Sequence, residues 1–204
     1  MCGRYYIDMD ERERSHIIYE ISQNSGPEGL RSVKIEGEVF PSDVVPVQTG
    51  IDRYEAMKWG FSKFDGKGAI INARSESALG ERSMFKKSMM ENRCLIPASS
   101  YFEWQDIGKR RKKKFEFFAL DRSVLRLAGC YRHEKGSALP VFVILTRQAA
   151  PDFAEIHPRM PVLIPAPYHR AWLEEGPAFM QYAADHLSFR AVDGTNVPAG
   201  IRPN

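Results

Sequence analysis

The chain has 204 residues, of which 43% are hydrophobic and 27% are charged, and its net charge at pH 7 is +3. This length is sufficient for one domain with a buried core, and the composition is typical of a globular protein rather than a disordered or fibrous one. A small positive charge permits a polyanionic partner without requiring one.

Membrane and metal-binding classes are disfavoured by the sequence. No stretch approaches the roughly 18 apolar residues of a membrane-spanning helix, and the first ten residues contain no apolar core of a signal peptide. The three cysteines, Cys2, Cys94 and Cys130, are widely spaced and form no CxxC pair. We therefore expect no disulfide framework, no metal site, no cofactor and a cytoplasmic location.

The first predicted elements are a strand at 3–7 and a helix that ends before Gly26-Pro27. Asp8 and Asp10 are both candidate N-caps of this helix. Asp8-x-x-Glu11 resembles a capping box, in which the two side chains bond to each other's backbone N–H groups.

The rest of the chain contains runs of strands with helices between and after them. In chain order we expect extended segments at 39–41 and 44–47, a strand at 54–61, a turn at 65–68, a helix at 84–92, strands at 94–98, 100–104, 115–120, 124–130 and 141–146, a helical turn at 151–156, helices at 168–173 and 178–186, a strand at 187–192 and a loop or tail at 194–204. No repeat or linker divides the chain. We expect a single α+β domain over residues 1–204, with a mainly antiparallel, curled, barrel-like sheet and peripheral helices.

Six consecutive basic residues, 109–114, lie between two predicted strands. This pattern predicts a hairpin with a basic tip. The tip is either an ordinary solvated turn or a patch that follows a DNA backbone, in which case binding would depend on salt. The sequence leaves both interpretations open.

Cys2 follows Met1, and removal of Met1 would make it an N-terminal cysteine. Such a residue carries an α-amine and a thiol on adjacent carbons. An aldehyde can form an imine with the amine, and the thiol can then close a thiazolidine ring. The amine titrates near ~7.7–8.0, so a large fraction is neutral at physiological pH. Taken alone, Cys2 is better explained as an incidental small residue at the end of the chain, and only the rest of the sequence favours the reactive interpretation.

Glu103 lies in the second notable stretch, Ser99 to Trp104, on a strand predicted to be buried. Strand alternation places Tyr101 and Glu103 on one face and Phe102 with Trp104 on the other. Burial raises the pKa of a carboxyl group towards the range of general acid–base catalysis. A salt bridge to a core arginine is the alternative.

Two further stretches place polar side chains two residues apart. Asn72 and Arg74 point the same way on an extended chain, and an amide with a guanidinium makes a plausible clamp for oxygen and phosphate. His157, which is fixed by Pro158, has the same relation to Arg159. A single histidine of this kind is more often structural than catalytic.

In this order the stretches resemble the motifs of the SRAP family, the SOS-response-associated peptidases or abasic-site processing proteins. The matching motifs are CGR with a following aromatic residue at 2–5, NARxE at 72–76, YFEW at 101–104 and HPRMPV at 157–162. The resemblance covers residues 2–172. Residues 173–204, where we expect a helix, a strand and a tail, match only weakly.

The resemblance implies a DNA-damage response protein that senses abasic sites in single-stranded DNA. An opened abasic sugar exposes an aldehyde, so the implied product is a covalent crosslink: a Schiff base first and a thiazolidine second, which shields the lesion. Met1 would be removed by a general aminopeptidase or by the domain itself, which is the peptidase activity of the family name. Lyase activity is a further implied possibility, and a monomer is expected.

The resemblance also implies roles for the matching residues. Cys2 would be the nucleophile through amine and thiol, Asn72 would orient the sugar and the amine, Glu103 would move protons, and His157 would exchange a proton with the sugar hydroxyl and promote reversal.

DNA contacts are implied at four further positions. Arg4, Arg74 and Arg159 would hold flanking phosphates, and Trp59 would stack on an unpaired base, a contact worth ~1–3 kcal/mol. For Trp59, a place in the core is an equally good interpretation.

Two other functions are compatible with the sequence. A thiol peptidase would need only the thiol of Cys2, assisted by His157 or Glu103. A non-covalent module for single-stranded nucleic acid would bind intact and abasic strands alike. The second alternative leaves Glu103 and His157 without a role, so the sequence favours covalent chemistry.

Overall fold

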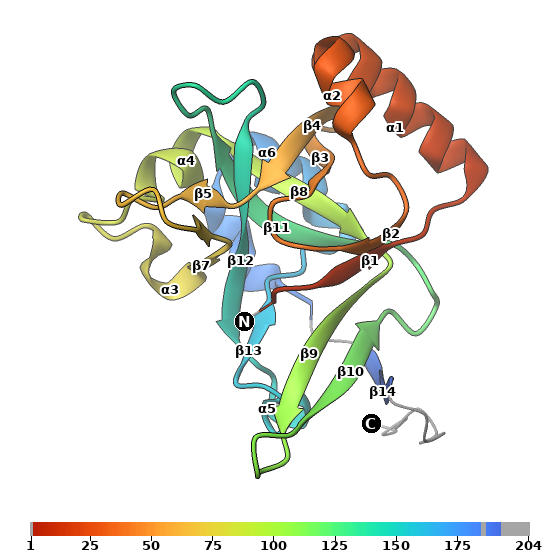
Figure 1. The fold of residues 1–204 in the computed structure, drawn as a ribbon, viewed down its shortest axis with the longest axis vertical. Coiled ribbons are helices and arrows are strands. Elements are labelled where there is room, and N and C mark those ends of the chain that lie inside the picture. Colours follow the sequence, from red (N-terminus) through yellow and green to blue (C-terminus); the bar gives the residue numbers. More distant parts are fainter. Residues whose placement is uncertain (1, 185–186, 193–204) are drawn as a thin grey trace.

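The computed structural model describes residues 2–184 and 187–192 of the protein (Figure 1). The strands are β1 (Tyr5–Ile7), β2 (Gly37–Val39), β3 (Val44–Gly50), β4 (Arg53–Trp59), β5 (Phe61–Ser62), β6 (Ala69–Ile70), β7 (Asn72–Arg74), β8 (Arg93–Ala98), β9 (Ser100–Asp106), β10 (Lys112–Phe118), β11 (Leu125–Arg132), β12 (Val141–Gln148), β13 (Arg159–Pro161) and β14 (Ser188–Ala191). The helices are α1 (Glu11–Asn24), α2 (Gly26–Ser32), α3 (Ser75–Ala78), α4 (Lys86–Glu91), α5 (Pro151–Ala154) and α6 (His169–Glu174), with 3-10 helices η1 (Ala166–Tyr168) and η2 (Pro177–Tyr182).

The strands form two main sheets. One has the order β14-β10-β9-β1-β2, and all its pairs are antiparallel. The other has the order β11-β8-β3-β4-β12-β13, with β7 beside β12. Because β11 also pairs with β12, five of these strands close into a ring. The predicted α+β class with a curled, mainly antiparallel sheet is confirmed; the parallel pairs are those of β12 with β4 and β7.

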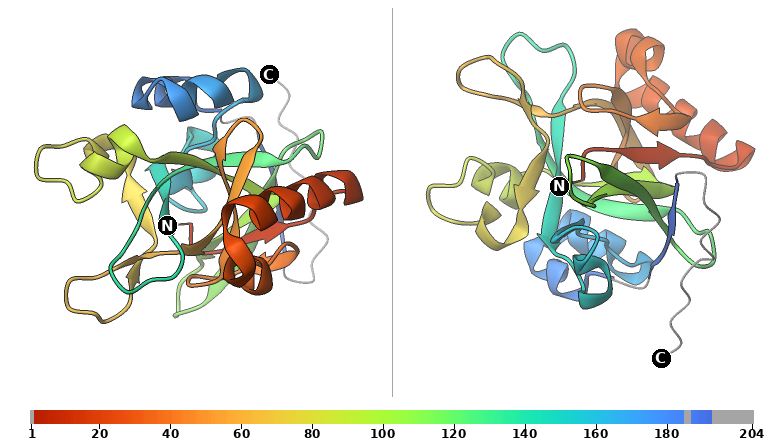
Figure 2. Two further views of the ribbon diagram at one scale, coloured as in Figure 1. Left: turned by 90° about the horizontal axis from the view of Figure 1, so that it is seen from above. Right: turned by 60° about the horizontal axis from the view of Figure 1, so that its bottom comes forward.

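The helices are peripheral, as expected. Helices α1 and α2 lie on one side of the strands, whereas α6 and η2 lie on the opposite side (Figure 2). Arg93 at the start of β8 is buried and donates hydrogen bonds to carbonyl oxygens at the ends of two helices, Met89 and Met90 in α4 and Trp172 and Leu173 in α6. One side chain thus joins both helices to the sheet.

The start of α1 differs from the expected capping box. Asp10, not Asp8, is the N-cap, and its Oδ1 accepts a hydrogen bond of 2.8 Å from the backbone N–H of Glu13. The N–H of Asp8 instead donates to Ser99 Oγ at 2.7 Å. Gly26-Pro27 does end the first helix, but it also begins α2, because proline is well accommodated in a first helical turn.

Several other boundaries depart from the predictions. Strand β10 begins within the basic run, so only part of 109–114 forms the hairpin tip. The expected helix at 178–186 is the 3-10 helix η2, and residues 185–186 and the tail at 194–204 lie outside the described residues. No helix in the described ranges is long and apolar enough to cross a membrane.

Candidate functional site

The pairing of β1 with β9 brings the N-terminal motif to Glu103. Tyr5 is opposite Tyr101, and the N–H of Phe102 donates to the carbonyl of Arg4 at 2.9 Å. Because the strands run antiparallel, the residues before β1 continue alongside those after Phe102. This register places the Cys2 thiol close enough to Glu103 for the carboxylate to raise the thiol pKa.

Cys2 itself is completely buried. Burial, followed by the nearby Glu103 carboxylate, raises the pKa of its thiol well above the usual value, so the sulfur is held as a neutral thiol. Asn72 on β7 donates from Nδ2 to the Cys2 carbonyl at 2.9 Å. The amide oxygen of Asn72 is buried and has no hydrogen-bond partner among the described residues, so it can accept one from a ligand or an amine.

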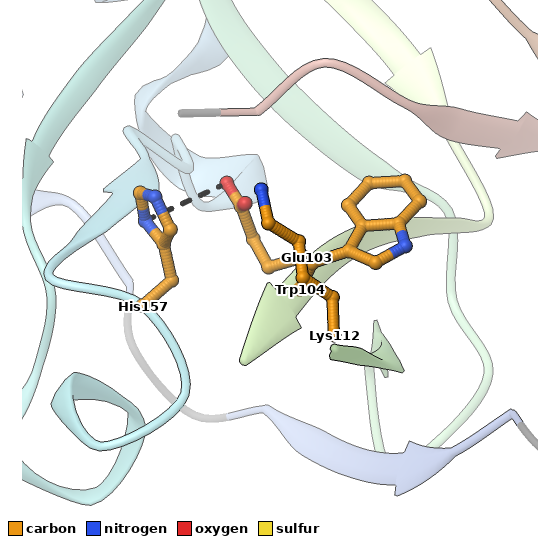
Figure 3. A pocket seen from close by; sticks show the side chains of 4 residues that line it. All are labelled: Glu103, Trp104, Lys112 and His157. Atoms are coloured by element: carbon orange, nitrogen blue, oxygen red, sulfur yellow. Dashed lines mark ion pairs between the residues drawn. The ribbon is translucent and has the colours of Figure 1, made fainter. Parts of the chain in front are cut away.

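Glu103 is only 3% exposed, and burial raises its pKa from 4.5 to about 7. Both protonation states are therefore populated at neutral pH, which suits a group that must donate and accept protons. Its Oε1 lies 3.9 Å from Nδ1 of His157, and the two side chains point towards one another (Figure 3).

The loop between α5 and β13 fixes the His157 ring. Its Nδ1 lies 2.9 Å from the carbonyl oxygen of Arg159 and 3.1 Å from the nitrogen of the same residue. Burial lowers the pKa of His157 below its ordinary value, so the imidazole is neutral at pH 7.

A cleft of about 320 Å³ opens over these groups, lined by Glu103, Trp104, Lys112 and His157 (Figure 3). Trp104 and Lys112 were not among the predicted site residues. Lys112 belongs to the basic run and enters the cleft because β10 pairs in register with β9. Within the part of the chain that the structure describes, no group of three His, Cys, Asp or Glu side chains is arranged to hold a metal ion.

Comparison with known proteins identifies the family of this chain. A family model described as SOS response associated peptidase (SRAP) matches residues 1–196. The chain belongs to the SRAP family. Abasic site processing protein YoqW of Bacillus subtilis is 30% identical over 190 residues, which cover 85% of this chain and 80% of that protein. Abasic site processing protein YedK of Escherichia coli is 29% identical over 180 residues, 86% of this chain and 80% of YedK.

A solved structure has a similar fold. A crystal structure of a Bacteroides thetaiotaomicron protein superposes with a TM-score of 0.76 at 17% identity, covering 95% of this chain and 93% of that one. At this identity the likeness concerns the fold alone.

The arginines of the SRAP motifs have different surroundings. Arg4 lies beside the cleft and is 25% exposed, with its Nη1 3.0 Å from Glu38 Oε1. Arg74 is exposed on β7. Arg159 is held by both carboxylate oxygens of Glu76, at 2.6 and 2.9 Å. Nη2 of Arg159 also donates to the carbonyl and hydroxyl oxygens of Thr146, so both terminal nitrogens of this guanidinium are engaged within the protein. Its contact with a DNA phosphate stays a prediction.

The prediction that Trp59 stacks on a DNA base is wrong. The indole is completely buried, lies 6.3 Å from the Phe142 ring and 5.3 Å from that of Tyr5, and donates from Nε1 to the carbonyl of Ile71 at 3.0 Å. A base could reach it only if the core opened. Trp59 therefore packs in the core, which was the other interpretation of the sequence.

Proposed function

We propose that the protein captures abasic sites in single-stranded DNA by forming a covalent bond through Cys2 once Met1 has been removed. The names of the relatives support abasic DNA as the target. The observation that carries the chemical proposal is the placement of a buried neutral thiol at Cys2 beside Glu103, a carboxyl group with a pKa of about 7.

The first step joins the Cys2 amine to the aldehyde carbon of the opened sugar. The amine nitrogen attacks the carbonyl carbon and forms a carbinolamine. Protonated Glu103 then donates its proton to the departing hydroxyl group, and water leaves as the C=N bond forms. Asn72 holds the Cys2 carbonyl and offers its amide oxygen to the amine, so the nitrogen is oriented towards the cleft.

The second step closes the ring. Glu103, now a carboxylate, accepts the thiol proton, and the sulfur bonds to the carbon of the protonated imine. The nitrogen keeps its one remaining hydrogen and takes back the electron pair of the C=N double bond. The products are a thiazolidine and one water molecule, and Glu103 begins and ends protonated. A thiol whose pKa is raised by burial needs such a base, because little thiolate is present without it.

His157 is proposed to act on the sugar hydroxyl. The imidazole is neutral at pH 7 and lies across the cleft from Trp104 and Lys112, so it can accept and return one proton as the sugar opens. The imine is also the intermediate from which a strand is cleaved by β-elimination. Ring closure by the Cys2 thiol removes that imine, so capture competes with any lyase activity.

The properties of Cys2 disfavour the thiol-peptidase alternative for external substrates. Such an enzyme attacks through a readily ionised thiol, whereas burial and the Glu103 carboxylate both raise the pKa of this one. Removal of Met1 by the domain itself remains part of the proposal, because it concerns the chain's own first peptide bond.

Intact mass spectrometry tests the proposal. The purified protein is weighed alone and after incubation with a single-stranded oligonucleotide that carries one abasic site, then heated in denaturant. We expect loss of Met1 and a heat-stable adduct of protein plus oligonucleotide minus one water. Cys2→Ser should give no stable adduct, and the matched control Cys130→Ser, another buried cysteine, should give the same adduct as the natural chain.

Two outcomes would refute this function. The first is the absence of an adduct from protein that has lost Met1. The second is an adduct of equal stability from Cys2→Ser, because serine cannot close a thiazolidine.

A further inference from the structure

A carboxylate occupies the space between two cations beside the cleft. Oε1 of Glu38, on β2, lies 2.7 Å from Lys114 Nζ and 3.0 Å from Nη1 of Arg4. The three side chains come from different segments of one sheet and are 20–30% exposed, so the cluster is open to solvent. Both cations thus meet on one oxygen at the molecular surface.

Aromatic rings hold the two cations in position. The Arg4 guanidinium lies 3.8 Å from the centre of the Phe40 ring, and Lys114 Nζ lies 3.9 Å from that of Phe102. Trp104 is close to both, at 5.6 and 5.7 Å, and it also lines the cleft with Glu103. One indole therefore forms the boundary between the Glu38 cluster and the cleft.

A third cation anchors the strand that carries Glu38. Lys34 Nζ donates to the backbone carbonyl of Glu38 and forms an ion pair of 3.1 Å with Asp43. Partial burial alone would raise the pKa of Glu38. The hydrogen bonds from Lys114 and Arg4 outweigh this effect, so the pKa lies below its ordinary value. The carboxylate is therefore charged at neutral pH.

We propose that Glu38 occupies a DNA phosphate site, so that a strand entering the cleft must displace its carboxylate from Arg4 and Lys114. This inference rests on the proposed function, because it assumes that DNA enters the cleft. A guanidinium and an ammonium converging on one oxygen anion are the donors that bind phosphate in proteins. A phosphodiester in the same place would lie next to Trp104, which also lines the cleft.

Displacement makes reversible binding weak. The binding strand gains two charge-assisted contacts but must first break the two that Glu38 already makes, so the net free energy is small. Intact strands are then released readily, whereas an abasic strand is retained by its covalent bond to Cys2. Glu38 is in this way a specificity-determining residue: it restricts retention to strands that react.

Binding of undamaged single-stranded DNA by Glu38→Gln tests this inference. Affinity is measured by fluorescence anisotropy over a salt series, with an oligonucleotide that contains no abasic site and cannot react with Cys2. We expect Glu38→Gln to bind severalfold more tightly at low salt. The slope of log K against log salt should steepen by about 0.7 for each cation that becomes available to phosphate.

Glu134→Gln is the matched control. Glu134 is also paired with an arginine, Arg132, and it follows β11 in the loop that lies at the opposite end of the molecule from the β9–β10 hairpin (Figure 1). This substitution removes the same charge from the protein but should leave the salt slope unchanged. An equal gain in both variants would show a general charge effect and would overturn the inference.

A purely structural role for Glu38 predicts a different result. In that case Glu38→Gln would lower thermal stability and leave DNA affinity unchanged or reduced, and the inference would be wrong. If Glu38→Gln does not fold, Glu38→Ala replaces it, because it also removes the carboxylate from Lys114 and Arg4. It should show the same gain, and no gain refutes the inference. Failure of the abasic adduct to form bears on the proposed function alone.

Discussion

The charge state of Glu103 should make the stability of the protein depend on pH. The pKa of this carboxyl is 4.5 ordinarily and about 7 in the folded chain, because folding removes it from water. Such a group stabilises the fold fully at pH values below 4.5, and its contribution is lost as the pH rises through 7. The rise in pKa corresponds to a change of about 3 kcal/mol in the free energy of unfolding.

Glu103→Gln removes this dependence, because a neutral amide has no proton to lose. Between pH 4.5 and pH 8, the free energy of unfolding of the variant relative to the natural chain should increase by about 3 kcal/mol. Urea unfolding followed by tryptophan fluorescence, at intervals over this range, measures both proteins. The natural chain loses stability relative to the variant as the pH rises, because its buried carboxyl group becomes charged.

The same substitution should remove a proton-transfer step. We expect the rate of adduct formation in the natural chain to follow a group with an apparent pKa near 7, and this inflection should be absent from Glu103→Gln. If the difference in unfolding free energy were constant from pH 4.5 to pH 8, Glu103 would not have a raised pKa. The roles assigned to it in both steps would then have no physical basis.

Three other substitutions test the surrounding structure. Asn72→Ala removes the hydrogen bond to the Cys2 carbonyl, so we expect a loss of about 1 kcal/mol in unfolding free energy and slower adduct formation on denaturing gels. Trp59→Phe should destabilise the core by about 1–3 kcal/mol but leave affinity for single-stranded DNA unchanged; weaker DNA binding in the folded variant would contradict the buried placement. Glu76→Gln weakens the ion pair to Arg159, whose hydrogen bonds, helped by backbone contacts, outweigh the opposing effect of burial and lower the pKa of Glu76 to about 2. The variant should be less stable at pH 7 by up to about 1 kcal/mol, and this difference should shrink as the pH falls from 4.5 towards 2, which acid titration of unfolding measures.

Local sequence patterns predicted most of the strands and the face on which each β9 side chain lies. Alternation separated Tyr101 and Glu103 from Phe102 and Trp104. In the structure Tyr101 stacks on Phe117 at 4.8 Å, whereas Lys114 lies over Phe102 and near Trp104. Period-2 alternation depends only on backbone geometry, so it holds whatever the strand pairs with.

Helix ends were predicted less well, because several side chains compete for the same backbone groups. Asp8 and Asp10 are equally good N-caps by residue type. The choice was decided by Ser99, which is distant in sequence and takes the N–H of Asp8. The hydrogen bond of an N-cap is local, but a residue distant in sequence can compete for the same backbone N–H group.

By itself, the sequence determined the fold class, the four motifs and the reactive potential of Cys2, since these depend on residue type, spacing and intrinsic pKa. Only the tertiary structure decided which charged side chains form ion pairs with one another. Arg159 and Arg4 look alike in sequence, yet Arg159 pairs with Glu76, whereas Arg4 pairs with Glu38 beside the cleft. Ion pairs join segments that are far apart in the chain, so their partners follow from strand register and packing rather than from any local pattern.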